Sequence, residues 1–384
     1  MHRLSVLLLM VAVGALIALG LVMLASTGEF APDAHGRPYY FLKHQLFWFG
    51  IGAVGCLLMA RTDYRKLVRQ WGWIYAAAAV LLFCCFVPGI GAKINGSHRW
   101  IRLASFTFQP SELGKAATIF AFAWWFSQEK GIEKQWLRGF LIPLLVVGFL
   151  MVLTVCEVDV GSTVLMGGTA VCMLFIAGSP KRFVGSLLAA GVLAVCMAIR
   201  LMPERLGRFM AFLEPEKYPA DAYQTQQGLI ALGSGGISGL GLGNGRQKLL
   251  YLPYAHTDFI FPVVGEELGL LGTLGVVFAY VLLILGGVMI AVKARDRAGL
   301  LTGMGIVMLI AMQAAINLGV TTQMLPNKGL PLPFISYGGS NLAFCLLGIG
   351  VLINIYHQGL SEQEEQHLEQ AELALKLEKQ VVRL

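Results

Sequence analysis

The chain has 384 residues, of which 57% are hydrophobic and only 13% are charged. A soluble domain carries about 25% charged residues, so this composition excludes a soluble globular enzyme and predicts a polytopic membrane protein. The formal net charge is +7, but the Lys and Arg residues stand in short gaps between apolar runs and form no basic stripe. That distribution follows the positive-inside rule and argues against nucleic acid as a partner.

Ten apolar segments approach the length of about 20 residues that a bilayer-crossing helix needs. They cover roughly residues 4–26, 41–60, 73–90, 111–127, 138–155, 162–178, 183–202, 260–292, 300–323 and 335–356. We therefore predict an all-α protein with about ten transmembrane helices in one membrane domain, residues 1–360. The first segment is too long for the apolar region of a signal peptide, so we expect it to be retained as a helix.

The Lys and Arg residues of the gaps concentrate in four alternate gaps, 61–72, 128–138, 179–182 and 293–299. These gaps are expected on the cytoplasmic side, which also places both termini there. The gap between the seventh and eighth segments, 203–259, is then a long outer loop that turns Gly-rich near its middle. The tail, 361–384, has apolar residues at helical spacing and predicts a cytoplasmic amphipathic helix, or else a solvated helix without a partner.

Ionisable residues at membrane depth are costly and are therefore functional candidates. Asp258, in the sequence His256-Thr257-Asp258, stands where the eighth apolar segment begins, and a falling dielectric would raise its pKa toward that of a useful general base. The alternative is that Thr257 or Asp258 caps the eighth helix. Glu266 and Glu267 lie too deep for a cap, so one could face a polar cavity while the other makes a buried hydrogen bond.

Lys115 lies one turn inside the fourth apolar segment, which begins near Ser111. A buried Lys needs a carboxylate partner or an anionic ligand. Glu112, three residues earlier, is the obvious structural partner. Alternatively, Lys115 and Arg99 could together bind a diphosphate, for which both side chains are suitable donors.

Two more outer gaps combine charge with helix-breaking residues. Lys328 precedes the sequence PLPFISYGGS, residues 331–340, whose Pro, Gly and Ser residues predict a break inside protein or along a cavity. The alternative there is a bent helix packed closely through its glycine pair. Glu157 and Asp159 lie between the fifth and sixth segments, where a simple polar turn is the alternative. On residues alone, the site fits an enzyme that acts on an anionic lipid-linked substrate, and it also fits a transporter.

Several of these stretches resemble the SEDS family (shape, elongation, division and sporulation). The resemblance covers about residues 40–356 and rests on RW at 99–100, QPSE at 109–112, LIALGSGG at 229–236, HTDFIF at 256–261, GEELG at 265–269 and PLPFISYGGS at 331–340. The sequence LPNKG around Lys328 resembles the division branch more than the elongation branch. The chain departs from the family at Val158, where many members have Pro, and at Asn341, where Ser is common.

The resemblance implies a peptidoglycan glycosyltransferase that polymerises lipid II at the outer face of the bacterial cytoplasmic membrane, with the division septum as an expected location. It implies as partners a class B penicillin-binding protein, which is a transpeptidase, and other divisome or elongasome membrane proteins. Asp258 matches the family's essential carboxylate and is the expected general base of an inverting reaction. The substrate-binding candidates are Arg99, Lys115, His256, Glu267, Lys328, Ser336, Tyr337 and Ser340.

The expected reaction needs no nucleotide, because the lipid-linked diphosphate is already activated. A divalent cation, Mg or Mn, could assist as a Lewis acid, but the sequence reveals no ligand set. Two other functions stay open: a lipid II flippase or other transporter, and a non-catalytic scaffold that recruits the transpeptidase. A transporter of the common repeat type should show two similar halves, and no such similarity is visible in the sequence.

Overall fold

The computed structural model describes residues 2–28, 39–94, 97–103, 106–201, 203–249 and 251–381. Within them, helices occupy all the apolar segments predicted from the sequence: α1 (His2–Thr27), α2 (Tyr40–Arg61), α4 (Trp71–Cys84), α5 (Pro110–Gln128), α6 (Ile142–Cys156), α7 (Val160–Ile176), α8 (Lys181–Leu201), α11 (Ile260–Val292), α12 (Arg297–Thr321) and α13 (Gly339–Val381). The other helices of the described residues are α3 (Tyr64–Arg69), η3 (Ile132–Lys134), η4 (Trp136–Leu141), α9 (Pro203–Leu213) and α10 (Pro219–Ser234).

Among the described residues, six helices are long and apolar enough to cross a membrane: α1, α2, α6 together with η4, α11, α12 and the first part of α13. α4 and α7 are apolar but shorter. α5 carries Glu112 and Lys115 within its first two turns. The protein is therefore a multi-pass membrane protein, as predicted, and the exact number of spans stays a prediction.

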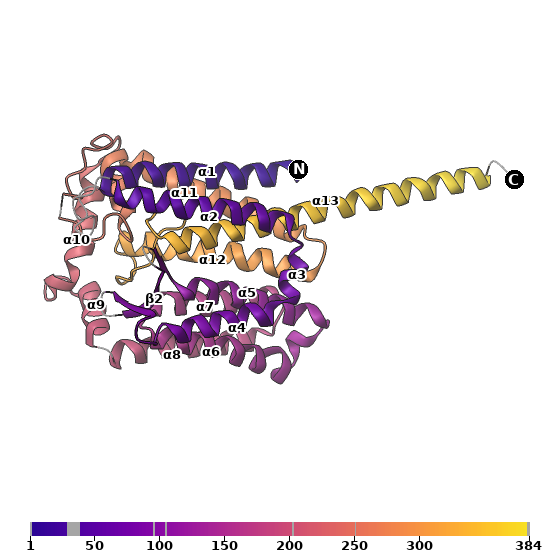
Figure 1. The fold of residues 1–384 in the computed structure, drawn as a ribbon, viewed down its shortest axis with the longest axis horizontal. Helices are drawn as coiled ribbons and strands as arrows, with labels where there is room; N and C mark the ends of the chain where they lie inside the picture. Colours follow the sequence, from indigo (N-terminus) through magenta and orange to yellow (C-terminus); the bar gives the residue numbers. More distant parts are fainter. Residues whose placement is uncertain are drawn as a thin grey trace.

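The two ends of the bundle differ in what they contain. Figure 1 shows α3 and both chain termini at one end, and α9, α10 and strand β2 at the other. At the α3 end, Arg65 pairs with Asp296 at 2.7 Å and Arg297 pairs with Glu133 at 3.1 Å. These ion pairs join three of the four basic gaps that we predicted to lie on one side of the membrane. That this side faces the cytoplasm stays a prediction.

The gap before α5, which we predicted to be outer, forms a small antiparallel sheet of three strands, β1 (Gly91–Ile94), β2 (Ser97–Leu103) and β3 (Phe106–Phe108), in the order β1-β2-β3. This sheet was not predicted from the sequence. Strands of this length have little periodic pattern of their own, and they are stabilised by pairing with each other. The sheet matters for function because β2 carries Arg99.

The long helix α11 is broken near its start. Gly269 has φ 66° and ψ −163°, a conformation that residues other than Gly rarely adopt. The Gly-rich loop, residues 233–245, packs into this break, and Leu270 N donates to Gly236 O at 2.9 Å. One turn earlier, Leu240 N donates to Glu266 O, also at 2.9 Å. The freed backbone groups are thus paired within the protein, as a break at membrane depth requires.

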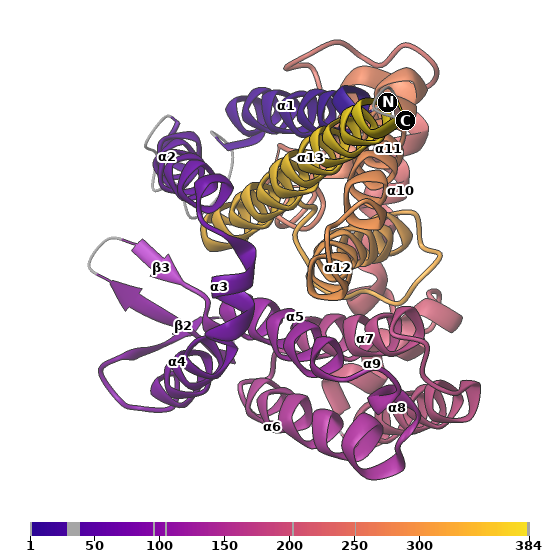
Figure 2. The ribbon, with the colours of Figure 1, turned by 90° about the vertical axis from the view of Figure 1, so that its right-hand side faces the viewer.

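The helices form packed groups, which Figure 2 shows along the bundle. α13 lies among α1, α2 and α12, and α12 also packs against α5 and α7; α4, α6 and α8 lie beyond them. Glycines bring α2 and α13 close together, because a Cβ at Gly350 would lie 2.4 Å from the backbone oxygen of Cys56. α12 is consequently enclosed on several sides, and its polar side chains are buried.

Candidate active site

Asp258 lies in the short segment that precedes α11. The N-cap of this helix is Phe259, and no side chain caps it. The Thr257 hydroxyl donates instead to Tyr254 O at 3.2 Å. The capping alternative for Thr257 and Asp258 is therefore wrong, and the carboxylate of Asp258 has no structural task at the helix terminus.

The segment that carries Asp258 is held by the loop before α13. Tyr337 N donates to His256 O at 2.9 Å, and the Ser336 hydroxyl donates to Thr257 O. The buried His256 ring lies 4.2 Å from the ring of Phe41, centroid to centroid. Three predicted substrate-binding residues, His256, Ser336 and Tyr337, thus come together beside Asp258, and their contacts shape the segment.

The residue after Lys328 touches the carboxylate of Asp258. A Cβ at Gly329 would lie 2.5 Å from Asp258 Oδ2, so the backbone of this loop passes directly against the acid. A residue with a side chain at this position would push the carboxylate of Asp258 aside. The sequence prediction that the Lys328 loop and Asp258 belong to one site therefore agrees with their placement.

Asp258 is half-buried, and burial raises its pKa to about 6. The positive charges of Arg99 on β2 and Arg208 on α9 act in the opposite direction. Asp258 is consequently ionised at neutral pH and is a stronger base than an ordinary Asp. Arg208 was not among the predicted site residues, because only the fold brings α9 to this end of the site.

Lys115 lies deeper and is already paired. Its ammonium is 2.8 Å from Glu112 Oε2, and both side chains are buried. It also donates to Gln313 Oε1 at 3.3 Å, while Asn341 Nδ2 donates to Glu112 Oε1 at 3.1 Å. The carboxylate partner expected from the sequence is confirmed, so the charge of Lys115 is balanced within the protein.

The turn between α6 and α7 contributes a second polar group. Asp159 caps α7 by accepting from Ser162 N at 3.1 Å. Its Oδ2 accepts from Gln109 Nε2 at 2.7 Å and from the Ser111 hydroxyl at 3.0 Å. Burial raises the pKa of the adjacent Glu157 to about 8, so that acid is mostly neutral at pH 7. The polar-turn alternative is thus confirmed for Asp159, which also connects α7 to the start of α5.

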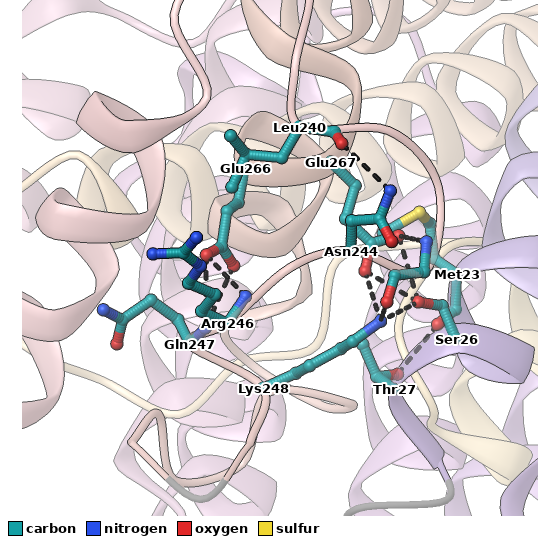
Figure 3. A network of polar contacts seen from close by, with 11 residues as sticks. Met23, Ser26, Thr27, Leu240, Asn244, Arg246, Gln247, Lys248, Glu266 and Glu267 are labelled. Carbon is teal, nitrogen blue, oxygen red and sulfur yellow. Dashed lines mark hydrogen bonds and ion pairs between the residues drawn. The ribbon is translucent and has the colours of Figure 1, made fainter.

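Glu267 belongs to a separate network, shown in Figure 3. Its carboxylate is fully buried and accepts from Lys248 Nζ at 2.6 Å, from the Ser26 hydroxyl at 2.7 Å and from Gly243 N at 3.0 Å. Glu266 points to the other side of the loop and accepts from Arg246 N at 2.7 Å. Protein groups therefore satisfy the charge of Glu267 without a ligand, so the substrate contacts proposed below do not include this residue.

Two amide side chains on α12 were missed by the sequence analysis. Gln313 and Asn317 are buried, and Asn317 Nδ2 donates to Asp258 O at 2.8 Å. A signal was present, since two amides four residues apart in an apolar segment share one helix face. Without the fold, however, nothing indicated what this face contacts.

Some buried polar atoms of the site have no hydrogen-bond partner within the described part of the chain. They are Arg99 Nε, Asn317 Oδ1 and Ser340 Oγ. Buried polar groups are normally paired, so these atoms are candidates to contact a ligand. No group of three or more His, Cys, Asp and Glu side chains suited to a metal ion occurs among the described residues.

Known proteins share both the sequence and the fold. The sequence model of the family described as "Cell cycle protein" (FtsW, RodA and SpoVE) matches residues 6–360. The chain belongs to the FtsW/RodA/SpoVE family. One relative, "Probable peptidoglycan glycosyltransferase FtsW" from Trichlorobacter lovleyi, is 40% identical, with 91% of this chain and 92% of the relative covered. "Stage V sporulation protein E" from Bacillus subtilis, another member, is 34% identical, with 91% and 96% covered.

Solved structures agree with this family assignment. A chain of the structure described as "Structural coordination of polymerization and crosslinking by a peptidoglycan synthase complex" has a TM-score of 0.76 and 27% identity, with 91% of this chain and 97% of that chain covered. The rod shape determining protein RodA of Thermus thermophilus has a TM-score of 0.67 and 27% identity, with 91% and 95% covered. The SEDS resemblance and the helical membrane fold are confirmed, and the curated relatives support the FtsW-like branch.

Proposed function

We propose that the chain is a peptidoglycan glycosyltransferase that polymerises lipid II for cell division. The observation that carries the proposal is the placement of Asp258, whose carboxylate lies against the backbone of Gly329. The positive charges of Arg99 and Arg208 act on this carboxylate, and burial raises its pKa to about 6. The relatives named "Probable peptidoglycan glycosyltransferase FtsW" support the same activity.

Asp258 acts as the general base. It accepts the proton from the 4-hydroxyl of the acceptor N-acetylglucosamine, and that oxygen attacks the anomeric carbon of the donor sugar. The bond from this carbon to undecaprenyl diphosphate breaks, so a single displacement inverts the anomeric configuration. A raised pKa improves proton transfer, while most of the carboxylate stays ionised at neutral pH.

Cations stabilise the diphosphate as it leaves. The positive charges of Arg99 and Arg208 already act on Asp258, and Lys328 precedes Gly329 in the loop that lies against its carboxylate. Preorganised positive charge aimed at the leaving group is usually a large contribution to catalysis. Lys115 is balanced by Glu112, so we assign it to the floor of the substrate site.

The proposed setting is the outer face of the bacterial cytoplasmic membrane, with both termini inside and the septum as the location. The proposed partner is a class B penicillin-binding protein that cross-links the new glycan, together with other divisome membrane proteins. The similarity to a chain of a peptidoglycan synthase complex supports this pairing. Polymerisation rates measured with and without a chelator test a role for Mg or Mn.

Polymerisation of purified lipid II in detergent tests the proposal. Asp258→Asn should lower the rate by about 10²-fold or more, because the amide keeps the shape but cannot accept the proton. Glu214→Gln is the matched control, since Glu214 lies on the same outer segment in an exposed ion pair and should retain activity.

The two other functions give different results in this assay. A transporter would form no glycan in detergent, where there is no membrane to cross. A scaffold that only recruits the transpeptidase would also form none alone, and its Asp258→Asn variant would still support growth. Glycan made by Asp258→Asn at the wild-type rate would remove Asp258 from the catalytic role.

A further inference from the structure

Asn317 joins two loops of the active site through one side-chain amide. It lies on α12 and is only 1% exposed. Its Nδ2 donates to Asp258 O at 2.8 Å and to Leu330 O at 2.7 Å. Both N–H groups are therefore used, one on the segment of the proposed base and one on the loop that follows Lys328.

A second amide repeats this arrangement one helical turn away. Gln313 Nε2 donates to Pro331 O at 2.9 Å, and its Oε1 accepts from Lys115 Nζ at 3.3 Å. Residues four apart on a helix lie one above the other. One face of α12 thus connects the buried Lys115 pair, the Lys328 loop and the Asp258 segment.

We infer that Asn317 is a positioning residue for the glycosyl transfer, which holds the backbone of Asp258 against the loop of Lys328 and Gly329. The inference rests on the proposed role of Asp258 as the base. The carboxylate of Asp258 already touches the backbone at Gly329, so a small shift of either loop changes where the base points. A helix is a more rigid support for such geometry than the loops themselves.

The competing explanation is that Asn317 only satisfies two buried carbonyls. The two explanations differ in what a substitution should change. A purely structural amide affects stability and leaves the folded enzyme's kinetics unchanged. A positioning amide changes kcat and the environment of the base in protein that is still folded.

Asn317→Leu tests the inference because Leu has nearly the same shape, adds no charge and removes both donors. It also removes the unpaired Oδ1, and the loss of a substrate contact at that atom would raise KM rather than lower kcat. The matched control is Thr321→Val, one turn further on, where the hydroxyl donates to Asn317 O at 2.9 Å within the same helix. The full chain is purified in detergent, and rates are measured against lipid II concentration and pH. Thermal unfolding of each variant is measured in parallel.

We expect Asn317→Leu to lower kcat by about 10²-fold, the effect of a shift of about 1 Å, with a much smaller change in KM. The acid limb of its pH profile should move to lower pH, because a loosened Asp258 is better hydrated. The wild type and the Asn317→Leu variant have the same charged or titratable groups near this segment, namely Arg99, Arg208, His256 and Lys328. Thr321→Val should keep the wild-type kcat and acid limb.

Folded Asn317→Leu with the wild-type kcat and acid limb would overturn the inference while leaving the proposed function intact. An equal loss of kcat in Thr321→Val would also overturn it. An active Asp258→Asn enzyme would instead overturn the proposed function. If Asn317→Leu does not fold, Asn317→Ser retains one donor and takes its place, with an intermediate kcat as the expected result and an unchanged one as the contrary result.

Discussion

Asp258 and Glu267 are carboxylates near the same end of the bundle, but their surroundings give them different roles. Glu267 is enclosed by an ammonium, a hydroxyl and a backbone amide, which satisfy its charge. Asp258 is influenced by two guanidinium groups and touches a glycine backbone, so it can meet a substrate hydroxyl. Full pairing makes Glu267 a structural ion, whereas the raised pKa of Asp258 suits a base.

The rate of polymerisation should depend on pH through Asp258. Its pKa is raised from 3.8 to about 6, so the active, deprotonated form dominates above pH 6 and is lost below it. At saturating lipid II, the initial rate should fall about tenfold from pH 7 to pH 5, since a base titrates tenfold per unit below its pKa. A profile that stays flat down to pH 5 would contradict this environment for Asp258.

Lys248→Met should destabilise the protein strongly, because it leaves the carboxylate of Glu267 buried without its cation. Breaking such a pair costs about 3–5 kcal/mol, and adding Glu267→Gln should recover part of it. Thermal unfolding in detergent measures both effects. Lys217→Met is the control, since its pair with Glu214 is exposed and should contribute little. Equal unfolding temperatures for the two Met variants would argue against the network.

The break in α11 at Gly269 determines how the Gly-rich loop packs. The loop backbone pairs with the groups that the break frees, and Glu266 and Glu267 then reach the loop amides from the helix side. The same helix begins directly after Asp258. A change at the break is therefore expected to affect both the loop and the placement of the base.

Gly269→Ala should lower the stability by at least about 1–3 kcal/mol, the cost of a conformation that residues other than Gly avoid. A Cβ there would also lie 2.4 Å from Gly239 N. Gly275→Ala is the control on the same helix, because its Cβ would meet nothing within 4 Å. We expect that variant to be neutral or slightly more stable. The unfolding temperatures of the two variants in detergent measure this difference. A Gly269→Ala protein that unfolds at the wild-type temperature would contradict the observed break.

The two ends of the helix bundle differ chemically. The end with α9, α10 and the sheet carries Arg208 and Arg99, whose charges act on Asp258. Figure 1 shows α13 extending from the opposite end beyond the other helices. Deleting residues 361–384 should therefore leave polymerisation in detergent within about twofold of the full chain, as expected for a terminal segment away from the site. A large loss of activity in a well-folded truncation would mean that the tail supports the bundle.

Features that depend on near neighbours along the chain were predictable from the sequence alone. Apolar runs of sufficient length predicted the helices, and the Lys and Arg residues of alternate gaps predicted that these gaps lie at one end of the bundle. The three-residue spacing of Glu112 and Lys115 predicted their ion pair. Asp258 was found because a carboxylate at the start of an apolar run is unusual. These signals are local, since helix periodicity and the cost of burying charge act within a few turns.

The groups that surround the base, and the identity of the structural carboxylate, depend on how the helices pack in three dimensions. Arg208 and Asn317 approach Asp258 from α9 and α12, and Lys248 and Ser26, 222 residues apart, meet at Glu267. The strands around Arg99 and the break at Gly269 likewise depend on pairing partners elsewhere in the chain. Such contacts are set by how the helices pack, and no spacing within a single segment encodes that packing.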